Sequence, residues 1–435
     1  MHDDRYGLAL STSSAQAAAA YIDGVDRMLA AWPGAEDALD AAISADPDFA
    51  LASIARARVH FVNAQVKPAQ ALAAQARELV ARNGTERERS HVETLALAME
   101  GKPAAALDHA LAHLERWPRD AMIMVLPLGA FGLFAFSGMS DHDSARVELC
   151  ERYAHHYGDD WFFLTYLGWS HTENGNVRHG RAITERAFAL KNGNAHAVHA
   201  LAHAMFEDGS GDDADRLIAD WLPSYDRVGL MHGHIVWHQA LVALEQGDAG
   251  RALDIYVARL QPHLTTAPPI NSVTDSVSLL WRLTAYGHEV PKNLWTDAAG
   301  HAEQSFPKAG VPFADMHVAL AAAATGNDDL LGRRVGELEQ RLASGRLVTG
   351  PVLPVIYRAL QAFGAGDYDG SASLLAPSAH EVVRIGGSHA QREIIEDTLI
   401  LALMKSGRAK EAGAIIDERL HRRPSPRDAA WRSVL

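Results

Sequence analysis

The stretch HVETLALAMEGKPAAALDHALAHLERWPRD, residues 91–120, decides the fold because it holds two amphipathic segments joined by a glycine turn. Apolar residues recur at steps of three and four on both sides of Gly101, which is the periodicity of helices. A small residue near the end of the first helix, a glycine turn, alanine in the second helix and a closing proline are typical of tetratricopeptide repeats. The stretch therefore predicts two helices packed as a pair.

The same layout recurs along the chain, in IVWHQALVALEQGDAGRALDIYVARLQP (residues 235–262) and IIEDTLILALMKSGRAKEAGAIIDERLHRRP (residues 394–424). One pair cannot bury its own apolar face, so successive pairs must stack. Alternating β-branched runs, the usual strand signal, are almost absent. We therefore predict an all-α, tetratricopeptide-like α-solenoid of paired antiparallel helices, curved around a concave groove and forming a single helical-repeat domain over residues 1–435.

Composition narrows the function classes. The chain has 435 residues and a formal net charge of −14, without a long cluster of Lys or Arg. Nucleic-acid binding draws its affinity from concentrated positive charge, so a nucleic-acid partner is not expected. Cys150 is the sole cysteine. An intrachain disulfide is therefore impossible, which favours a reducing, cytoplasmic location.

Neither the N-terminus nor the most apolar segment predicts a membrane or export signal. The first ten residues, MHDDRYGLAL, carry two aspartates where a secretory signal would be positively charged. The most apolar segment, residues 121–136, is shorter than a membrane span and contains Pro127. We expect a buried helix there, bent at the proline, and no membrane partner.

Several longer strings extend the likeness beyond a generic repeat. NAHAVHALAHAMFEDG (residues 194–209), HGHIVWHQALVALEQGD (232–248), DSVSLLWRL (275–283), FADMHVALA (313–321) and GGSHAQRE (386–393) follow one another in this order. With ADPDFALA and RERSHVETLALAMEGKPAAAL earlier in the chain, they resemble motifs of the tetratricopeptide repeat protein 38 family over nearly the whole length. The resemblance implies a tetratricopeptide-like α-solenoid and supplies no reaction. HGHIVWH departs from the family pattern, which tends to have a second aromatic residue beside the tryptophan.

Repeat-length spacing singles out a row of polar residues. Thirty-five positions separate His203 from His238, and 37 separate His238 from Asp275. Because successive first helices of a solenoid lie side by side, residues one repeat apart meet on the same face. Asp315 follows Asp275 after a further 40 positions, and His389 continues the row two repeats later. We predict catalytic acid–base roles for His203, His238, Asp275 and His389.

Two HxxxH pairs predict a metal site as an alternative to acid–base catalysis by these histidines. His199 and His203 are four positions apart, as are His234 and His238, so each pair shares one helical face. Imidazoles at this spacing suit Zn, Fe or Ni, or a haem. The alternative is that the four histidines pack between repeats and hydrogen-bond within the fold. No HExxH motif is present, and the sequence identifies no cofactor.

The string DSVSLLWRL places Asp275, Ser278 and Arg282 on one helical face, with Trp281 at its edge. In a ligand site, Arg282 would bind a carboxylate and Trp281 would form a flat wall. The structural alternative is an ion pair between Asp275 and Arg282, with Trp281 in the core.

Three further residues are candidates for substrate contact. Asp315 precedes an alanine-rich helix, where it suits an N-cap as well as a ligand contact, and His317 follows on the first turn. Tyr166 lies in an earlier first helix and would supply an apolar wall. Such an aromatic residue is more often part of a core.

The string GGSHAQR predicts a capped helix start with an anion site. Ser388 and Gln391 fit a capping box, and the two preceding glycines let the chain enter the helix tightly. His389 and Arg392 share the first turn, and a helix N-terminus attracts negative charge. We therefore expect Arg392 and Ser388 to contact an anionic substrate group.

Together these patterns predict an enzyme that acts on a small anionic or aromatic molecule in the groove, by hydrolysis or elimination. The sequence shows neither a dinucleotide fingerprint nor a P-loop. A metal- or haem-dependent enzyme using the paired histidines is the first alternative. The second is a non-catalytic adaptor that binds a peptide. A homodimer is compatible with either class.

Overall fold

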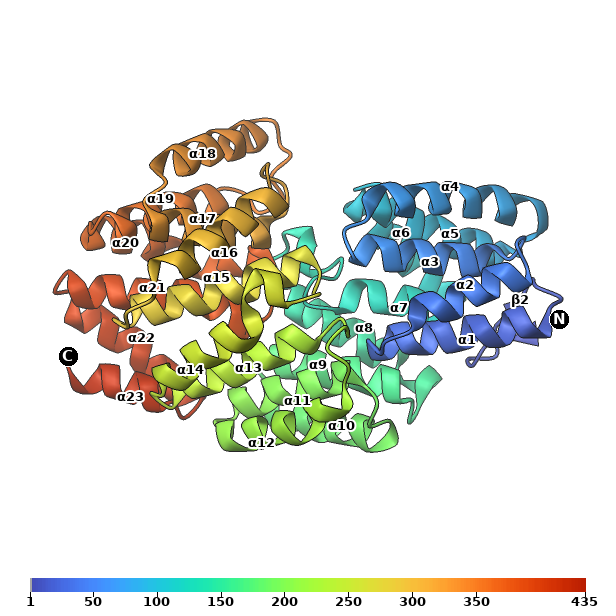
Figure 1. The fold of residues 1–435 in the computed structure, drawn as a ribbon, viewed down its shortest axis with the longest axis horizontal. Coiled ribbons are helices and arrows are strands. Elements are labelled where there is room, and N and C mark those ends of the chain that lie inside the picture. Colours follow the sequence, from blue (N-terminus) through green and yellow to red (C-terminus); the bar gives the residue numbers. More distant parts are fainter. Residues whose placement is uncertain (1) are drawn as a thin grey trace. The chain divides into compact units, whose positions relative to one another are not determined.

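The computed structural model describes residues 2–435, and this part of the chain is all-α apart from one short strand pair (Figure 1). Strands β1 (His2–Asp3) and β2 (Ala9–Leu10) are antiparallel, with His2 opposite Leu10. The remaining elements are helices that follow one another as antiparallel pairs. The predicted all-α, tetratricopeptide-type fold is confirmed.

The chain forms two compact units. Unit 1 comprises the described residues up to Ser137, His142–Ala200 and Val228–Met231, and unit 2 comprises Gly138–Asp141, Leu201–Arg227 and His232–Leu435. The boundary falls inside α11 (Ala195–Glu207), after Ala200.

The helices of unit 1 are α1 (Ala15–Ala30), α2 (Ala35–Ala45), α3 (Ala50–Val62), α4 (Val66–Asn83), α5 (Glu86–Met99), α6 (Pro103–Arg116), α7 (Ala121–Leu128), η1 (Ala135–Ser137), α8 (His142–Tyr157), α9 (Trp161–Glu173) and α10 (Val177–Leu190). Those of unit 2, after α11, are α12 (Gly211–Trp221), η2 (Leu222–Ser224), α13 (His232–Glu245), α14 (Ala249–Ile255), η3 (Tyr256–Leu260), η4 (Pro262–Leu264), α15 (Pro269–Ala285), α16 (Lys292–Ser305), α17 (Pro312–Thr325), α18 (Asp328–Ala343), α19 (Val352–Gly364), α20 (Tyr368–Leu375), η5 (Ala376–Ile385), α21 (His389–Lys405), α22 (Ala409–Arg422) and α23 (Pro426–Ser433).

Glycines in left-handed backbone make the turns within the pairs. Gly101 between α5 and α6 has φ 73°, and Gly247 between α13 and α14 has φ 82°. A side chain is strained in this region, whereas glycine is not. The glycine turns expected in these two repeats are therefore confirmed.

In unit 1, α9 and α10 approach each other closely at two glycines. A Cβ on Gly168 would lie 2.8 Å from the carbonyl oxygen of Gly180, and a Cβ on Gly180 would lie 2.5 Å from that of Gly168. These contacts are with backbone, which cannot move aside as a side chain can. The close packing fixes the register of α9 against α10.

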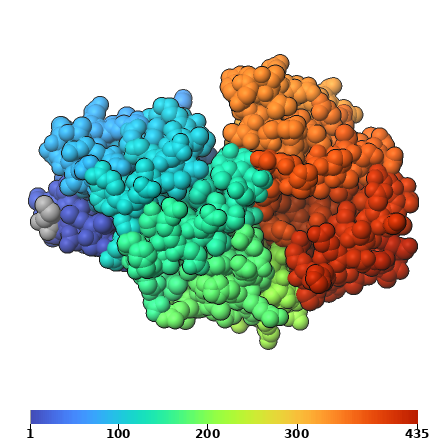
Figure 2. Space-filling view, turned by 180° about the vertical axis from the view of Figure 1, so that it is seen from behind, coloured from blue at the N-terminus to red at the C-terminus, as the bar shows by residue number. Residues whose placement is uncertain are grey.

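In unit 2 the first helices of successive pairs contact one another. Helix α15 packs against α17 and also against α21. The indole Nε1 of Trp281 donates to Oγ1 of Thr398 at 3.0 Å, and Tyr286 donates to Asp397 at 2.6 Å. Side chains on the inward face of these helices therefore form a shared core. In the space-filling view, the orange and red segments of unit 2 lie directly against each other on the surface (Figure 2).

The most apolar segment differs from its prediction. Helix α7 ends at Leu128 and is followed by an irregular stretch and the short η1, so residues 121–136 are not one bent helix. After Leu128 the chain passes close to the end of α7, and a Cβ on Gly132 would lie 2.8 Å from the carbonyl oxygen of Pro127, which explains the glycine at this position. Among residues 2–435, none of the helices combines the length and apolar character needed to cross a bilayer.

Candidate functional site

Three histidines of unit 2 lie together on α11 and α13. The ring centroids of His203 and His238 are 4.4 Å apart, and those of His234 and His238 are 5.0 Å apart, both pairs meeting edge to face. One ring nitrogen from each of the three lies within 4.8 Å of the others. All three side chains are buried. We call His203, His234 and His238 the histidine centre.

Asp275 of α15 supports the histidine centre. Its Oδ1 accepts a hydrogen bond of 2.8 Å from Nδ1 of His234. This bond engages Nδ1, so Nε2 is the ring nitrogen of His234 that Asp275 does not contact. A carboxylate in this position fixes the tautomer and orientation of a metal-binding imidazole. Burial raises the pKa of Asp275, and the neighbouring His234 opposes that rise.

His238 is held in its neutral form. Burial, and then the neighbouring His203 and His234, lower the pKa of this imidazole well below its usual range. A neutral imidazole offers a nitrogen lone pair at physiological pH, either to a metal ion or to a proton. The centre therefore suits metal binding or general-base chemistry.

The chemistry of these side chains fits a single divalent first-row ion. Zn–N bonds are about 2.0–2.1 Å long, which places the nitrogens of a tetrahedral site about 3.4 Å apart. The ligand nitrogens of the three rings lie within 4.8 Å of one another, so binding one ion would require the rings to rotate wherever a pair is farther apart than the tetrahedral separation. The rings of His203 and His238 contact each other directly, with no porphyrin-sized space between them. Binding of a metal ion or a haem by these histidines stays a prediction.

Two other residues predicted for the site, His199 and Tyr166, belong to unit 1. His199 lies one helical turn before His203 on α11, and its ring stacks on Trp169 with centroids 5.3 Å apart. Tyr166 on α9 is buried with its ring 5.7 Å from that of His196, and burial raises the pKa of the tyrosine. Their predicted roles, as a metal ligand and as a substrate wall, stay predictions.

His389, the first residue of α21, pairs with Glu207 at the end of α11. The distance from Nδ1 of His389 to Oε1 of Glu207 is 2.9 Å. Burial opposes the charged imidazole, yet the Glu207 carboxylate raises the pKa of His389 overall. His389 and Arg423 in turn overcome the effect of burial and lower the pKa of Glu207 to about 2. The pair is therefore ionic over a wide pH range.

The predicted capping box at the start of α21 is confirmed. Ser388 accepts from the backbone N–H of Gln391, and the Gln391 side chain accepts from that of Ser388. A Cβ on Gly387 would lie 2.8 Å from Cδ2 of Phe313, which explains the glycine. The guanidinium of Arg392 donates to the carbonyl oxygen of Gly387. Substrate contact by Ser388 and Arg392 stays a prediction.

The polar face of α15 contacts two different helices. Ser278 accepts a hydrogen bond of 3.0 Å from the indole of Trp237 on α13. Arg282 donates to the carbonyl oxygen of Ala390 at 2.8 Å and lies 3.7 Å from the Asp397 carboxylate, so the alternative of an ion pair with Asp275 is wrong. Trp281 is buried against α21. Its role and that of Arg282 as substrate contacts stay predictions.

Asp315 and His317 are buried within α17. Asp315 is not an N-cap, because the helix begins three residues earlier and the cap position belongs to Val311. The Asp315 carboxylate accepts from the N–H of Gly310 at 2.9 Å, and burial raises its pKa to about 6. His317 lies 2.8 Å from the carbonyl oxygen of Phe313, and burial lowers its pKa to about 3. Substrate contact by either residue stays a prediction.

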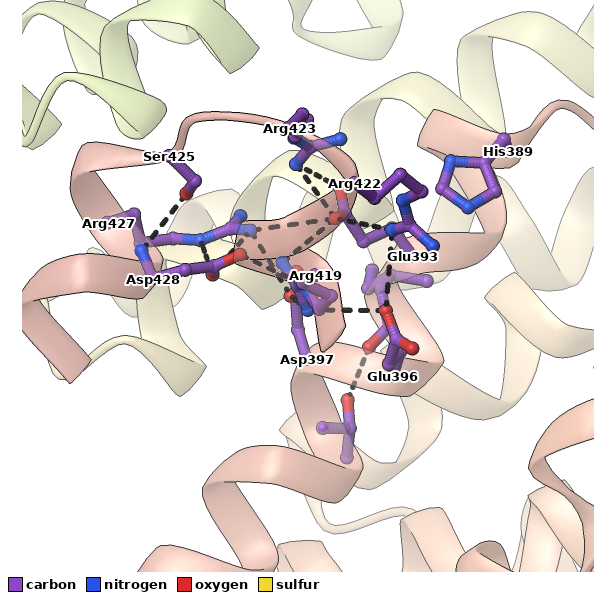
Figure 3. Close-up of polar contacts among 12 residues, drawn as sticks. His389, Glu393, Glu396, Asp397, Arg419, Arg422, Arg423, Ser425, Arg427 and Asp428 are labelled. Atoms are coloured by element: carbon purple, nitrogen blue, oxygen red, sulfur yellow. Dashed lines mark hydrogen bonds and ion pairs between the residues drawn. The ribbon is translucent and has the colours of Figure 1, made fainter. Parts of the chain in front are cut away.

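A buried ion cluster at the C-terminal end of unit 2 was missed by the sequence reasoning (Figure 3). We call it the C-terminal ion cluster, and its members are Arg419, Arg423, Arg427, Glu393, Asp397 and Asp428. The Arg419 guanidinium alone contacts Glu393 at 2.8 Å, Asp397 at 2.7 Å and Asp428 at 2.9 Å. The cluster joins α21 to α22 and α23.

The sequence did carry a signal for this cluster. Arg419, Arg423 and Arg427 recur every four positions, as do Glu393 and Asp397. Such spacing is usually read as a solvated helix face, where ion pairs contribute little. Here Arg419 and Arg423 are 1% and 2% exposed, so the charges depend on each other inside the protein. Sequence periodicity does not reveal that difference in burial.

Comparison with known proteins adds similarities of architecture. No family model matches the chain. It is similar to a tetratricopeptide repeat protein from Parabacteroides merdae ATCC 43184, with 12% identity over 62% of this chain and 97% of that one and a TM-score of 0.36. It is also similar to yeast Tom70 (13% identity, 93% and 91% covered, TM-score 0.32) and to the Naa15/Naa10 structure bound to HypK-THB (11%, 93% and 63%, TM-score 0.25). These values say nothing about activity or partners. The layout of helix pairs and glycine turns makes the chain a tetratricopeptide-type helical-repeat protein.

Proposed function

We propose that this protein is a metal-dependent helical-repeat enzyme whose histidine centre binds a divalent ion such as Zn²⁺ and whose substrate is a small anionic or aromatic molecule. The observation that carries the proposal is the arrangement of His203, His234 and His238, with the Asp275 carboxylate hydrogen-bonded to Nδ1 of His234. Three imidazoles with a supporting carboxylate are the donor set of catalytic zinc sites.

Each residue of the centre has a separate task. His203, His234 and His238 would hold the ion, and Asp275 would fix the orientation of the His234 ring through its hydrogen bond to Nδ1. When bound, the ion supplies Lewis acidity and an activated water for hydrolysis. The surrounding helices exclude bulk water from the buried rings, which strengthens electrostatic interactions at the centre.

The start of α21 supports an anionic substrate. Glu207 lies one helical turn after His203 on α11, about 6 Å along the axis, and it pairs with His389. This pair links the first residue of α21 to the helix that carries His203, and the N-terminal end of α21 has a positive dipole and the Arg392 guanidinium on its first turn. In this proposal they hold the negative group of the substrate, and Glu207, which raises the pKa of His389, favours the charged form of that imidazole.

The test combines metal analysis with hydrolase assays. We would measure bound metal by mass spectrometry in tag-free protein, and turnover of aryl ester and aryl phosphate substrates before and after metal removal. The proposal predicts a metal-bearing protein whose hydrolysis is lost on chelation and restored by Zn²⁺. Hydrolysis that survives complete metal removal would support the acid–base enzyme instead. Absence of both metal and turnover would favour the peptide-binding adaptor.

Three broader expectations accompany this proposal. The low cysteine content supports a cytoplasmic location. We further propose that the repeats act as a single functional domain. The chemistry of the centre requires one copy of the chain and is compatible with a homodimer.

A further inference from the structure

A second group of metal-binding side chains lies in unit 1, outside the proposed function. Glu151 of α8, His171 of α9 and His179 of α10 each offer one ligand atom, and these atoms lie within 4.8 Å of one another. The three residues come from three consecutive helices. The sequence pattern did not single them out, because their spacing matches neither a repeat length nor a single helical face.

His171 is the central member of this group. Its Nε2 lies 2.8 Å from Oε1 of Glu151, and its ring meets that of His179 edge to face with centroids 4.6 Å apart. The His171 side chain is 8% exposed, whereas the Glu151 side chain is 54% exposed. The buried Nδ1 of His171 has no hydrogen-bond partner in the structure, which is uncommon for a buried polar atom.

The packing of α9 against α10 holds the two histidines in place. His171 lies three residues after Gly168, and His179 directly precedes Gly180. The backbones meet at these glycines so closely that neither position has room for a Cβ. A rigid support is what a preorganised metal site requires.

Helix polarity and ligand chemistry both favour a cation here. His171 lies in the last turn of α9, where the carbonyl end of the helix dipole is negative. Glu151 adds a negative charge, and two imidazoles with one carboxylate form a donor set found in zinc and iron sites.

We propose that Glu151, His171 and His179 form a second metal site, which binds Zn²⁺ or a similar first-row ion with its fourth position open to water. The exposed Glu151 and His179 give the ion direct access from solvent. The ion ties α8, α9 and α10 together. An ordinary ion pair between Glu151 and His171 would account for their contact without any role for His179.

The test measures Zn²⁺ binding to tag-free, metal-stripped full-length protein by equilibrium dialysis. His179→Ala removes one ligand at an exposed position, so the variant is expected to fold. Glu151→Gln removes the charge and keeps the shape. His60→Ala is the matched control, because His60 lies on α3 in the same unit and contacts Gln65 outside the group. His238→Ala reports separately on the histidine centre.

We expect His179→Ala to bind one Zn²⁺ fewer per chain than the parent, or to bind it at least about tenfold more weakly. Loss of a residue that only hydrogen-bonds to a metal ligand already weakens metal binding about tenfold or more, so loss of a ligand should do at least as much. Glu151→Gln should weaken the same site by a similar factor, and His60→Ala should match the parent. The proposal is overturned if His179→Ala keeps the stoichiometry and affinity of the parent. Loss of Zn²⁺ in His238→Ala alone would support the histidine centre and refute the second site.

Discussion

Replacing Asp275 by Asn tests how the histidine centre is supported. The Asp275 carboxylate is 4% exposed and accepts a 2.8 Å hydrogen bond from Nδ1 of His234. An amide of the same shape can instead donate its NH₂ group to Nδ1, which moves the imidazole proton to Nε2. In the proposed site, Nε2 is the nitrogen of His234 that binds the metal ion.

We expect Asp275→Asn to weaken metal binding by about 10- to 100-fold, the range for loss of a supporting carboxylate. This corresponds to about 1.4–2.7 kcal/mol, since each factor of ten is about 1.4 kcal/mol. The stability of the metal-free protein should not fall, because burial already disfavours the charged carboxylate, as the raised pKa of Asp275 shows. Loss of affinity without loss of stability separates this role from simple packing.

The assay is competition for Zn²⁺ with a chromophoric chelator, in a His179→Ala background that removes the site proposed in unit 1. Asp254→Asn is the control, because Asp254 is exposed on α14. Urea unfolding of the metal-free proteins gives the stabilities. An affinity within twofold of the parent for Asp275→Asn would refute the reasoning, and so would an equal loss in the Asp254 variant.

Three further predictions concern stability, each checked by urea or thermal unfolding. Gly180→Ala should destabilise unit 1 by about 1–3 kcal/mol through overpacking, whereas Gly300→Ala, with open space around its Cβ, should be neutral or stabilising by up to about 1 kcal/mol; equal effects would contradict this. Arg419→Met should cost about 3–5 kcal/mol because it leaves buried carboxylates without their cation, and a loss below about 1 kcal/mol would show that the C-terminal ion cluster is dispensable. His389→Gln should lower stability most between about pH 4.5 and 6.5. The pKa of His389 is raised in the folded protein, so its contribution to stability is complete below about pH 6.5 and is lost as the pH rises through the folded-state pKa. The pKa of Glu207 is lowered to about 2, so its contribution to stability is complete above about pH 4.5 and is lost as the pH falls toward that pKa. A stability difference between His389→Gln and the parent that does not vary with pH would refute an ionic pair.

The helix pairs and their turns could be predicted from sequence because local periodicity and glycine determine them. Gly101 and Gly247 have the left-handed backbone that the turns require. The spacing of one repeat length also correctly predicted that His203 and His238 lie in contact, since the first helices of adjacent pairs are neighbours. Local rules and nearest-neighbour packing were enough for these features.

Contacts between distant elements could not be predicted in this way. Asp275 meets His234 rather than His238, because a one-turn difference on α13 decides which ring faces α15. Arg282 reaches α21, more than 100 positions away, where Ala390 and Asp397 lie. Glu151 and His171 meet through the packing of α8 against α9. Side-chain direction and tertiary packing, rather than spacing, determine all of these contacts.

The central claim is that three imidazoles of unit 2 bind one metal ion, and X-ray absorption at the edge of the bound metal tests it most directly. The measurement uses the His179→Ala protein loaded with one equivalent of Zn²⁺. We predict a first shell at about 2.0–2.1 Å with the scattering of three imidazoles, reduced to two in His238→Ala. A shell without imidazole scattering, or an identical spectrum for His238→Ala, would contradict the claim.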